Sequence, residues 1–407
     1  MNSSTLRRTP EKILVPLGFS FSALAAGIKV SGRPDLALVE ASGGAAGAAL
    51  FTTNRVVAAP VEVGRASLAA SGGMVRAVIV NSGNANCATG HAGLQACERV
   101  CREAAKILGV SSTQIFPSST GIIGVPMPDE KIRAKLPELI ASRSADERSA
   151  LGFARAIMTT DTRPKIASAR FQATSRDVTV LGIAKGAGMI HPQLATMLVY
   201  LLTDIEARAR ELQRLLRDAC DDSLNCMSID GDTSTNDTAL LLASGASGVR
   251  LGHAGVRKKF GAALTAVCQS LAEQIISDGE GVQHVIRLRV EEARSRNEAM
   301  IVARTIAHSL LVKTAWAGAD PNWGRILAAV GRAGISVDPG RVQIFIGPQQ
   351  VCRNGVACAF HEKQAHRALA QPVCEVRVLL GRGRQSLRFL TTDLTAEYVR
   401  INADYST

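Results

Sequence analysis

The stretch that decides the fold is Lys185-Gly-Ala-Gly-Met-Ile-His-Pro-Gln-Leu-Ala-Thr-Met-Leu-Val-Tyr-Leu-Leu-Thr-Asp204. Its second half is an apolar run that predicts a strand over residues 197–202. Its two glycines let the backbone pass close to a neighbouring group, and Pro192 stiffens the approach to this strand. Because Lys185 precedes the glycines, the segment does not match a phosphate-binding loop. A threonine at the head of such a strand, Thr196, is by itself an ordinary β-former.

Short apolar runs separated by turn residues surround this stretch and predict further strands. Helical periodicity favours helices between and after these runs, the longest over residues 253–277. The expected strands are 37–40, 48–52, 60–63, 75–80, 167–172, 178–184, 285–290, 342–346, 374–380 and 386–391. The other expected helices are 93–108, 129–142, 146–158, 205–219, 295–311 and one opened by Asp320-Pro321 that ends at Ala329. Strands in runs with helices outside them indicate an α+β layered sandwich and not a βαβ succession.

Composition bounds the class of protein. The 407 residues carry a net charge of +12, but the basic residues are scattered and no basic run is interleaved with aromatics, so no nucleic-acid partner is expected. The nine cysteines include no CxxC pair, which favours a reducing, cytoplasmic location without a disulfide framework. No segment has 18 uninterrupted apolar residues, so no membrane partner is expected either.

Segments along most of the chain resemble one known family. Besides the stretch around Thr196, they are Asn81-Ser-Gly-Asn-Ala-Asn86, Ser119-Thr-Gly-Ile-Ile-Gly124, Met158-Thr-Thr-Asp161, Asn225-Cys-Met-Ser-Ile-Asp-Gly-Asp-Thr-Ser-Thr-Asn236, Asp278-Gly-Glu-Gly281, Gly318-Ala-Asp-Pro-Asn-Trp-Gly-Arg325 and Arg400-Ile-Asn-Ala-Asp-Tyr-Ser-Thr407. In this order they resemble the glutamate N-acetyltransferase (ornithine acetyltransferase) family. The resemblance implies an α/β/β/α sandwich of the autoprocessed DmpA/ornithine-acetyltransferase type, with a smaller C-terminal α/β lobe.

The resemblance also implies that the chain cuts itself between Ala195 and Thr196, giving an α chain of residues 1–195 and a β chain of residues 196–407. The chemistry of Thr196 explains the cut. A hydroxyl needs an adjacent base to act as a nucleophile at neutral pH. Cleavage frees the α-amine of Thr196, whose reference pKa of roughly 7.7–8.0 suits a general base. Thr196 would therefore be inactive as the nucleophile of acetyl transfer until the bond between Ala195 and Thr196 is cut.

By the same resemblance, the Thr120 hydroxyl and the Gly121 N–H form the oxyanion hole. The residues implied to contact substrate are Thr160, Lys185, Thr196, Glu280, Asn402 and Thr407. Charge complementarity assigns Lys185 to a substrate carboxylate and Glu280 to the ornithine δ-amine. In the Thr159-Thr-Asp-Thr162 segment, Thr162 could serve in place of Thr160.

The implied function is acetyl transfer from N-acetylornithine to glutamate in arginine biosynthesis, by a ping-pong reaction through acetylated Thr196. No cofactor is implied. Acetyl-CoA would be a co-substrate if the enzyme also makes N-acetylglutamate from it, and no residue decides this. The implied assembly is a heterotetramer of two α and two β chains. The alternatives are an autoprocessed aminopeptidase or amidase, which shares the nucleophile, and a basic binding protein without enzymatic activity.

Other polar residues are assigned structural roles. His191 lies five positions before Thr196 but is not needed as a base, and a contribution to the shape of the cleavage loop is expected instead. Asp230 and Asp232 lie in a run that lacks the later Glu of a calcium loop, so a structural turn is expected. His361 and His366 have no Cys or carboxylate cluster near them in the sequence, so no metal site is expected.

Overall fold

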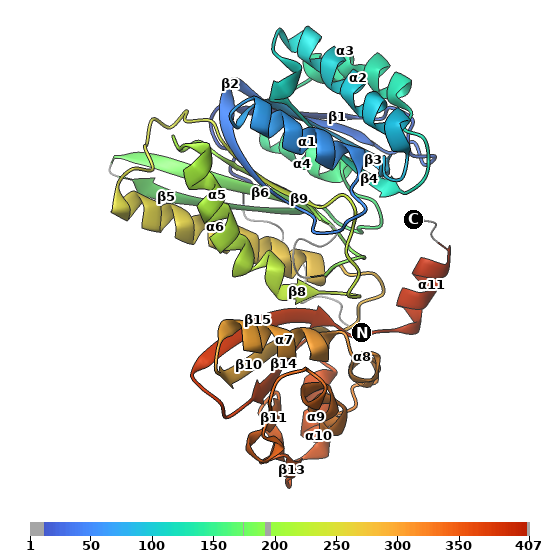
Figure 1. Ribbon diagram of the computed structural model, residues 1–407, viewed down its shortest axis with the longest axis vertical. Helices are drawn as coiled ribbons and strands as arrows, with labels where there is room; N and C mark the ends of the chain where they lie inside the picture. Colours follow the sequence, from blue (N-terminus) through green and yellow to red (C-terminus); the bar gives the residue numbers. More distant parts are fainter. Residues whose placement is uncertain (1–11, 174, 192–196, 405–407) are drawn as a thin grey trace.

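The computed structural model describes residues 12–173, 175–191 and 197–404. Figure 1 shows two lobes, one above the other, with the terminal helix α11 (Ala396–Asp404) lying at their side. The larger lobe contains an eight-stranded sheet, and the smaller lobe contains a seven-stranded sheet. Within the described residues, no helix combines the length and apolar character that a membrane span needs.

The sheet of the larger lobe has the order β4-β3-β2-β9-β7-β6-β5, with β1 paired to β2. Its strands are β1 (Phe19–Leu24), β2 (Leu36–Phe51), β3 (Met74–Asn84), β4 (Ile115–Ile122), β5 (Lys165–Ala173), β6 (Arg176–Lys185), β7 (Leu198–Thr203) and β9 (Thr238–Ala243). The long strand β2 pairs with β1 and β3 through its first half and with β9 through its second half. Its register shifts between Glu40 and Ala45, where Gly44 has a φ of 78°. This bend folds the sheet into two layers.

The larger lobe also contains helices α1 (Ala59–Ala70), α2 (Gly90–Leu108), α3 (Asp129–Ala141), α4 (Glu147–Ala156), α5 (Ala209–Asp221) and α6 (Ala254–Ile276). Side chains alternate across each strand. In β7, Leu198 and Tyr200 pack between the two sheet layers, whereas Val199 and Leu201 pack on the outer side, with the apolar faces of α5 and α6. Helices α2 and α3 cover the outer face of the other layer. These layers confirm the predicted α/β/β/α sandwich.

The smaller lobe has the strand order β13-β12-β11-β14-β10-β15-β8. Its elements are β8 (Met227–Ser228), β10 (Val285–Ala293), β11 (Gln343–Ile346), β12 (Gln349–Arg353), β13 (Val356–Ala357), β14 (Val373–Leu379), β15 (Gln385–Thr392), α7 (Arg296–Ala307), α8 (Leu310–Ala317), α9 (Trp323–Gly331) and α10 (Glu362–Leu369). Its own apolar cluster, which includes Trp316 and Phe389, forms a second core. The predicted smaller C-terminal α/β lobe is thereby confirmed.

Three local predictions are wrong. Residues 60–63, predicted as a strand, lie in helix α1, where Pro60 occupies the first turn that tolerates proline. The helix predicted over 295–311 is two helices, because α7 ends at Ala307, with His308 as its C-cap, and Ser309 is the N-cap of α8. The helix predicted from Asp320 begins at Trp323, where the Asn322 side chain accepts the N–H of Arg325. The predicted strands 37–40 and 48–52 are parts of one strand, β2. Strands β1, β4, β8, β9, β12 and β13 and helices α10 and α11 were not predicted.

Candidate active site

A cavity of about 240 Å³ opens where the ends of several elements of the larger lobe meet α11. Six of the predicted site residues line it: Thr120, Gly121, Thr160, Lys185, Glu280 and Asn402. They come from the end of β4, the loop before β5, the end of β6, the loop after α6, and α11. The fold therefore brings together residues as far apart in sequence as 120 and 402. Ala195, Thr196 and Thr407 lie outside the described residues.

The end of β4 is held rigidly at the cavity. Gly121 has a φ of 133°, and a Cβ atom there would lie 2.4 Å from the backbone carbon of Gly83 on β3. Only glycine fits this close approach. Buried amides fix the same segment: the Asn236 amide donates to the Ser119 carbonyl at 2.9 Å, and Ser119 Oγ donates to Asn81 Oδ1 at 2.6 Å. Thr120 and Gly121 thus lie on a backbone that has little freedom to move.

Lys185 supplies a positive charge on one side of the cavity. It is 4% exposed, and its Nζ donates to Thr120 Oγ1 at 3.1 Å. Within the part of the chain that the structure describes, no carboxylate lies within ion-pair distance of this Nζ. Burial lowers the pKa of Lys185, and the nearby Asp161 carboxylate opposes that shift. An ammonium in this position can bind a substrate carboxylate at the cavity wall.

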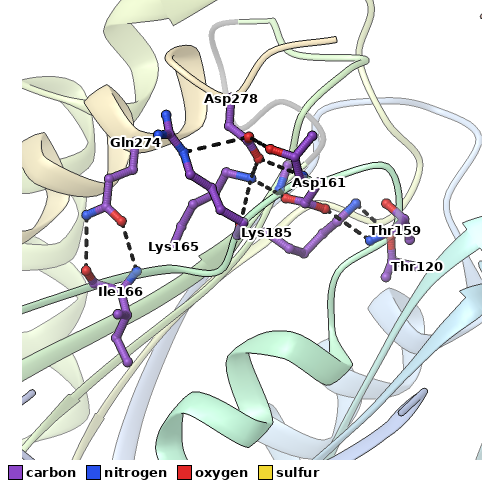
Figure 2. A network of polar contacts seen from close by, with 11 residues as sticks. Thr120, Thr159, Asp161, Lys165, Ile166, Lys185, Gln274 and Asp278 are labelled. Atoms are coloured by element: carbon purple, nitrogen blue, oxygen red, sulfur yellow. Dashed lines mark hydrogen bonds and ion pairs between the residues drawn. The ribbon is translucent and has the colours of Figure 1, made fainter. Parts of the chain in front are cut away.

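A cluster of buried charges lies beside Lys185 (Figure 2). Lys165 Nζ lies 2.5 Å from Asp161 Oδ1 and 2.6 Å from Asp278 Oδ2. Burial alone would raise the pKa of Asp161, but Lys185 and Lys165 outweigh it and lower that pKa to about 2. The Asp161 carboxylate is therefore ionised at neutral pH, next to Lys185.

The other side of the cavity is acidic. Glu280 accepts a hydrogen bond from the Asn402 amide at 2.9 Å, and its own backbone N–H donates to the Ala187 carbonyl at 2.8 Å. Asp230 and Asp232 also line the cavity. The cavity thus has a cationic wall at Lys185 and an anionic wall at Glu280, an arrangement suited to a small molecule that carries both a carboxylate and an amine.

The start of β7, next to the predicted nucleophile, is anchored by a buried carboxyl group. The Met197 N–H donates to Asp237 Oδ1 at 2.9 Å, and Asp237 is 1% exposed. Burial raises the pKa of Asp237 well above its usual value, although Met197 and Lys185 act against the shift. The residue that follows Thr196 therefore has a fixed position at the head of the strand.

The Thr160 and Thr162 alternatives differ in the structure. Thr160 lines the cavity, whereas the Thr162 hydroxyl donates to Asp278 and its N–H donates to the same carboxylate at 3.0 Å. Since the Thr162 hydroxyl is engaged away from the cavity, the geometry favours Thr160 as the substrate contact.

Two of the polar residues that were assigned structural roles, Asp230 and His191, make contacts with neighbouring segments. Asp230 accepts the N–H groups of Met189 and Ile190 at 2.6 and 2.9 Å, which is the turn-stabilising role expected. The ring of His191 lies against that of His308, with centroids 4.9 Å apart, and burial lowers its pKa. The described residues contain no group of three or more His, Cys, Asp or Glu side chains placed to hold a metal ion.

Comparison with known proteins identifies the family. The ArgJ family matches residues 20–407. The chain belongs to the ArgJ family. It is 47% identical to the arginine biosynthesis bifunctional protein ArgJ of Methylococcus capsulatus over 395 residues, which cover 96% of this chain and 95% of that protein. It is 41% identical to the protein of the same name from Pseudomonas fluorescens, with 96% of each covered.

Solved structures give partial matches to this ArgJ-family chain. The Bacillus halodurans arginine biosynthesis bifunctional protein ArgJ is 37% identical, with 51% of this chain and 98% of that chain covered and a TM-score of 0.49. The ornithine acetyltransferase of Mycobacterium tuberculosis, solved in complex with ornithine, is 33% identical, with 46% and 96% covered and a TM-score of 0.39.

Sequence reasoning missed the residues that support the site. Asp161 and Asp278 lie in segments that resemble the family. Both contact Lys165, but Lys165 and Asp278 are 113 residues apart in the sequence. Asp237 and Asn236 end a polar run that was interpreted as a turn. The only signal was the charge of Lys165 at the start of a strand, which a sequence cannot distinguish from an exposed lysine.

Proposed function

We propose that this chain is an acetyltransferase of arginine biosynthesis that moves acetyl from N-acetylornithine to glutamate through an acetyl ester of Thr196. Family membership supports the pathway. The observation that carries the assignment is the two-sided cavity, with the Lys185 ammonium beside Thr120 on one wall and Glu280 on the other. N-acetylornithine has a carboxylate next to its acetylated nitrogen and an ammonium at its far end, so its charges match both walls.

The chemistry follows from these positions. Thr196 Oγ attacks the acetyl carbonyl while the free α-amine of Thr196 accepts the hydroxyl proton. The Thr120 hydroxyl and the Gly121 N–H stabilise the oxyanion, as preorganised donors do in acyl transfer. The C–N bond then breaks, and the α-nitrogen of ornithine leaves with the proton. The α-amine of glutamate next attacks the acetyl ester, loses its proton to the same base and restores Thr196.

We propose that self-cleavage at residues 195–196 creates the α-amine of Thr196, giving pieces 1–195 and 196–407 that stay together. The sheet order supports this association. Strands β9 and β7, which follow the cut, lie between β2 and β6, which precede it. The two pieces would therefore share one hydrogen-bonded sheet and its core. A heterotetramer of two α and two β chains and a cytoplasmic location complete the proposal; the nine free cysteines suit a reducing compartment.

Intact-mass measurement tests the cleavage. The wild-type chain should give two pieces divided before Thr196, and the Thr196→Ala variant should remain one chain without activity. A wild-type chain that stays whole yet transfers acetyl would contradict the proposed base. Native mass measurement of the purified protein then tests whether two α and two β chains assemble into the proposed heterotetramer.

Separate assays test the reaction and its donors. Acetyl transfer to glutamate is measured with N-acetylornithine and with acetyl-CoA in turn, with no added cofactor. Transfer from N-acetylornithine is required by the proposal, and transfer from acetyl-CoA would add the second activity. Release of acetate at a rate independent of glutamate would instead indicate the amidase alternative.

A further inference from the structure

A buried lysine near the cavity has no role in the reaction described above. Lys165, at the start of β5, is fully buried and does not line the cavity. Its Nζ lies between two carboxylates, those of Asp161 and Asp278, as Figure 2 shows. A buried charge loses its hydration and is unfavourable unless close partners of opposite charge compensate it. Lys165 is therefore tied to both carboxylates at once.

The two carboxylates belong to different loops. Asp161 accepts the Thr159 N–H at 3.0 Å and the Gly186 N–H at 2.7 Å, so it fixes the backbone on either side of Thr160 and next to Lys185. Asp278 accepts the Thr162 N–H at 3.0 Å. It begins the loop that carries Glu280. Through Lys165, the loop of Thr160 is joined to the loop of Glu280.

The same cluster surrounds the Lys185 ammonium. The charged groups that act on Lys185 are Asp161 from the loop before β5, Lys165 from β5, Asp237 from the segment before β9, Glu280 from the loop after α6 and Lys29 from the loop after β1. Among them, Asp161 opposes the burial of Lys185 most strongly. Asp161 thus favours the charged form of Lys185.

From these contacts we infer that Lys165 and Asp161 are positioning residues for the proposed acetyl transfer. Lys165 sets the spacing between the loops of Thr160 and Glu280, and Asp161 keeps Lys185 charged at the cavity wall. Neither residue touches the substrate. The inference rests on the proposed function, because it assigns these groups to the binding of N-acetylornithine.

The first test uses Lys165→Met and, as its matched control, Lys135→Met, which removes an exposed lysine paired with Glu138 at 2.7 Å on α3. The double variant Lys165→Met/Asp278→Asn removes one charge of each sign and leaves the Asp161 carboxylate with Lys185 as its neighbouring cation, so it replaces the single variant if that one does not fold. The KM for N-acetylornithine should rise about tenfold with a smaller change in kcat, a size typical of coupled buried groups. An unchanged KM in a folded variant, with Lys135→Met also unchanged, would overturn the role of Lys165.

The second test is the pH profile of kcat/KM in Asp161→Asn. Loss of this carboxylate lowers the pKa of Lys185, so the basic limb of the profile should move to lower pH. Lys165→Met should not move it that way, because it removes a cation. A basic limb that stays in place in Asp161→Asn would overturn the role of Asp161.

Ornithine affinity, measured by calorimetry on the same proteins, separates the inference from the proposed function. If the wild-type chain transfers no acetyl, the proposed function is wrong. Calorimetry then tests the positioning roles of Lys165 and Asp161 by themselves. Weaker ornithine binding in Lys165→Met and Asp161→Asn than in wild type supports them. Equal affinities, or no binding by wild type, overturn them.

Discussion

Lys185 Nζ donates a hydrogen bond to Thr120 Oγ1 at 3.1 Å, and this contact joins the end of β6 to the end of β4. A threonine hydroxyl has one proton to donate and can accept from elsewhere. Because Oγ1 accepts from Lys185, its proton is free to point into the cavity. A hydroxyl that accepts from an ammonium is also polarised as a donor. The lysine therefore orients and strengthens the hydroxyl that the oxyanion hole requires.

Replacing Thr120 with valine tests this donor, since valine keeps the shape and removes the hydroxyl. We expect kcat to fall about 10²–10³-fold, the usual effect of losing one oxyanion-hole donor. Steady-state assays of acetyl transfer measure it. The control Thr314→Val removes an exposed hydroxyl that donates to a carbonyl on α8, and it should retain wild-type kcat. A Thr120→Val enzyme with wild-type kcat would show that the hydroxyl does not stabilise the oxyanion.

Gly121→Ala should be inactive and less stable. The new Cβ would lie 2.4 Å from the Gly83 carbon at a backbone φ of 133°, so the end of β4 must shift. Strain of this kind costs about 1–3 kcal/mol of unfolding free energy. Denaturant titration measures that loss. Gly152→Ala is the matched control, because Gly152 lies in helix α4 and a Cβ atom there would meet only Ala23 Cβ, at 3.9 Å. Equal stability of the Gly121→Ala and Gly152→Ala variants would contradict the argument.

The sequence predicted the layered fold because each layer has its own periodicity. The apolar stripe of α6 and the apolar run of β7 are local patterns, and both appear in the structure as a buried helix face and a buried strand. Residues 60–63 were misassigned because Pro60, Val61 and Val63 have the apolar character of a strand, while the burial that selects a helix comes from distant contacts such as that of Gly64 with Phe116.

The site was predictable only in part for a related reason. Thr120, Lys185 and Glu280 lie in segments that resemble a family, so each could be named. The residues that hold these three in place are paired across the fold: Lys165 with Asp278, and Asp237 with Met197. Such pairs have no spacing that a single sequence reveals. A buried lysine at the start of a strand becomes recognisable only when its two carboxylates are located.

Asn402→Ala should weaken binding of N-acetylornithine. The Asn402 amide donates to Glu280 Oε2 at 2.9 Å and holds the Glu280 carboxylate in one orientation toward the substrate amine. Without the amide, the carboxylate can rotate away from that orientation. We expect KM to rise about five- to tenfold with kcat little changed, as for loss of one hydrogen bond to a charged group. The control Arg400→Ala breaks an exposed pair with Glu397 on the same helix. A similar KM change in both variants would point to the helix and not to the amide.

The contact between His308 and Ser228 predicts how stability depends on pH. His308 Nε2 lies 2.8 Å from Ser228 Oγ, which donates to the Ile190 carbonyl at 2.9 Å. Since the Ser228 proton is used in this way, His308 Nε2 is the donor to Ser228 Oγ. Burial, and then the neighbouring His191, Lys313, Arg304 and Arg332, lower the pKa of His308 to about 4.

The folded pKa of His308 lies below its unfolded value of roughly 6.5, so the unfolded chain takes up the proton first as pH falls. The contribution of His308 is therefore complete above about pH 6.5 and is lost as pH falls toward 4, by about 3 kcal/mol in total. Denaturant titrations between pH 4 and 8 should give a flatter pH dependence for His308→Gln than for wild type. His253→Gln controls for loss of an exposed histidine. Parallel curves for wild type and His308→Gln across this range would refute the assignment of a neutral, buried ring.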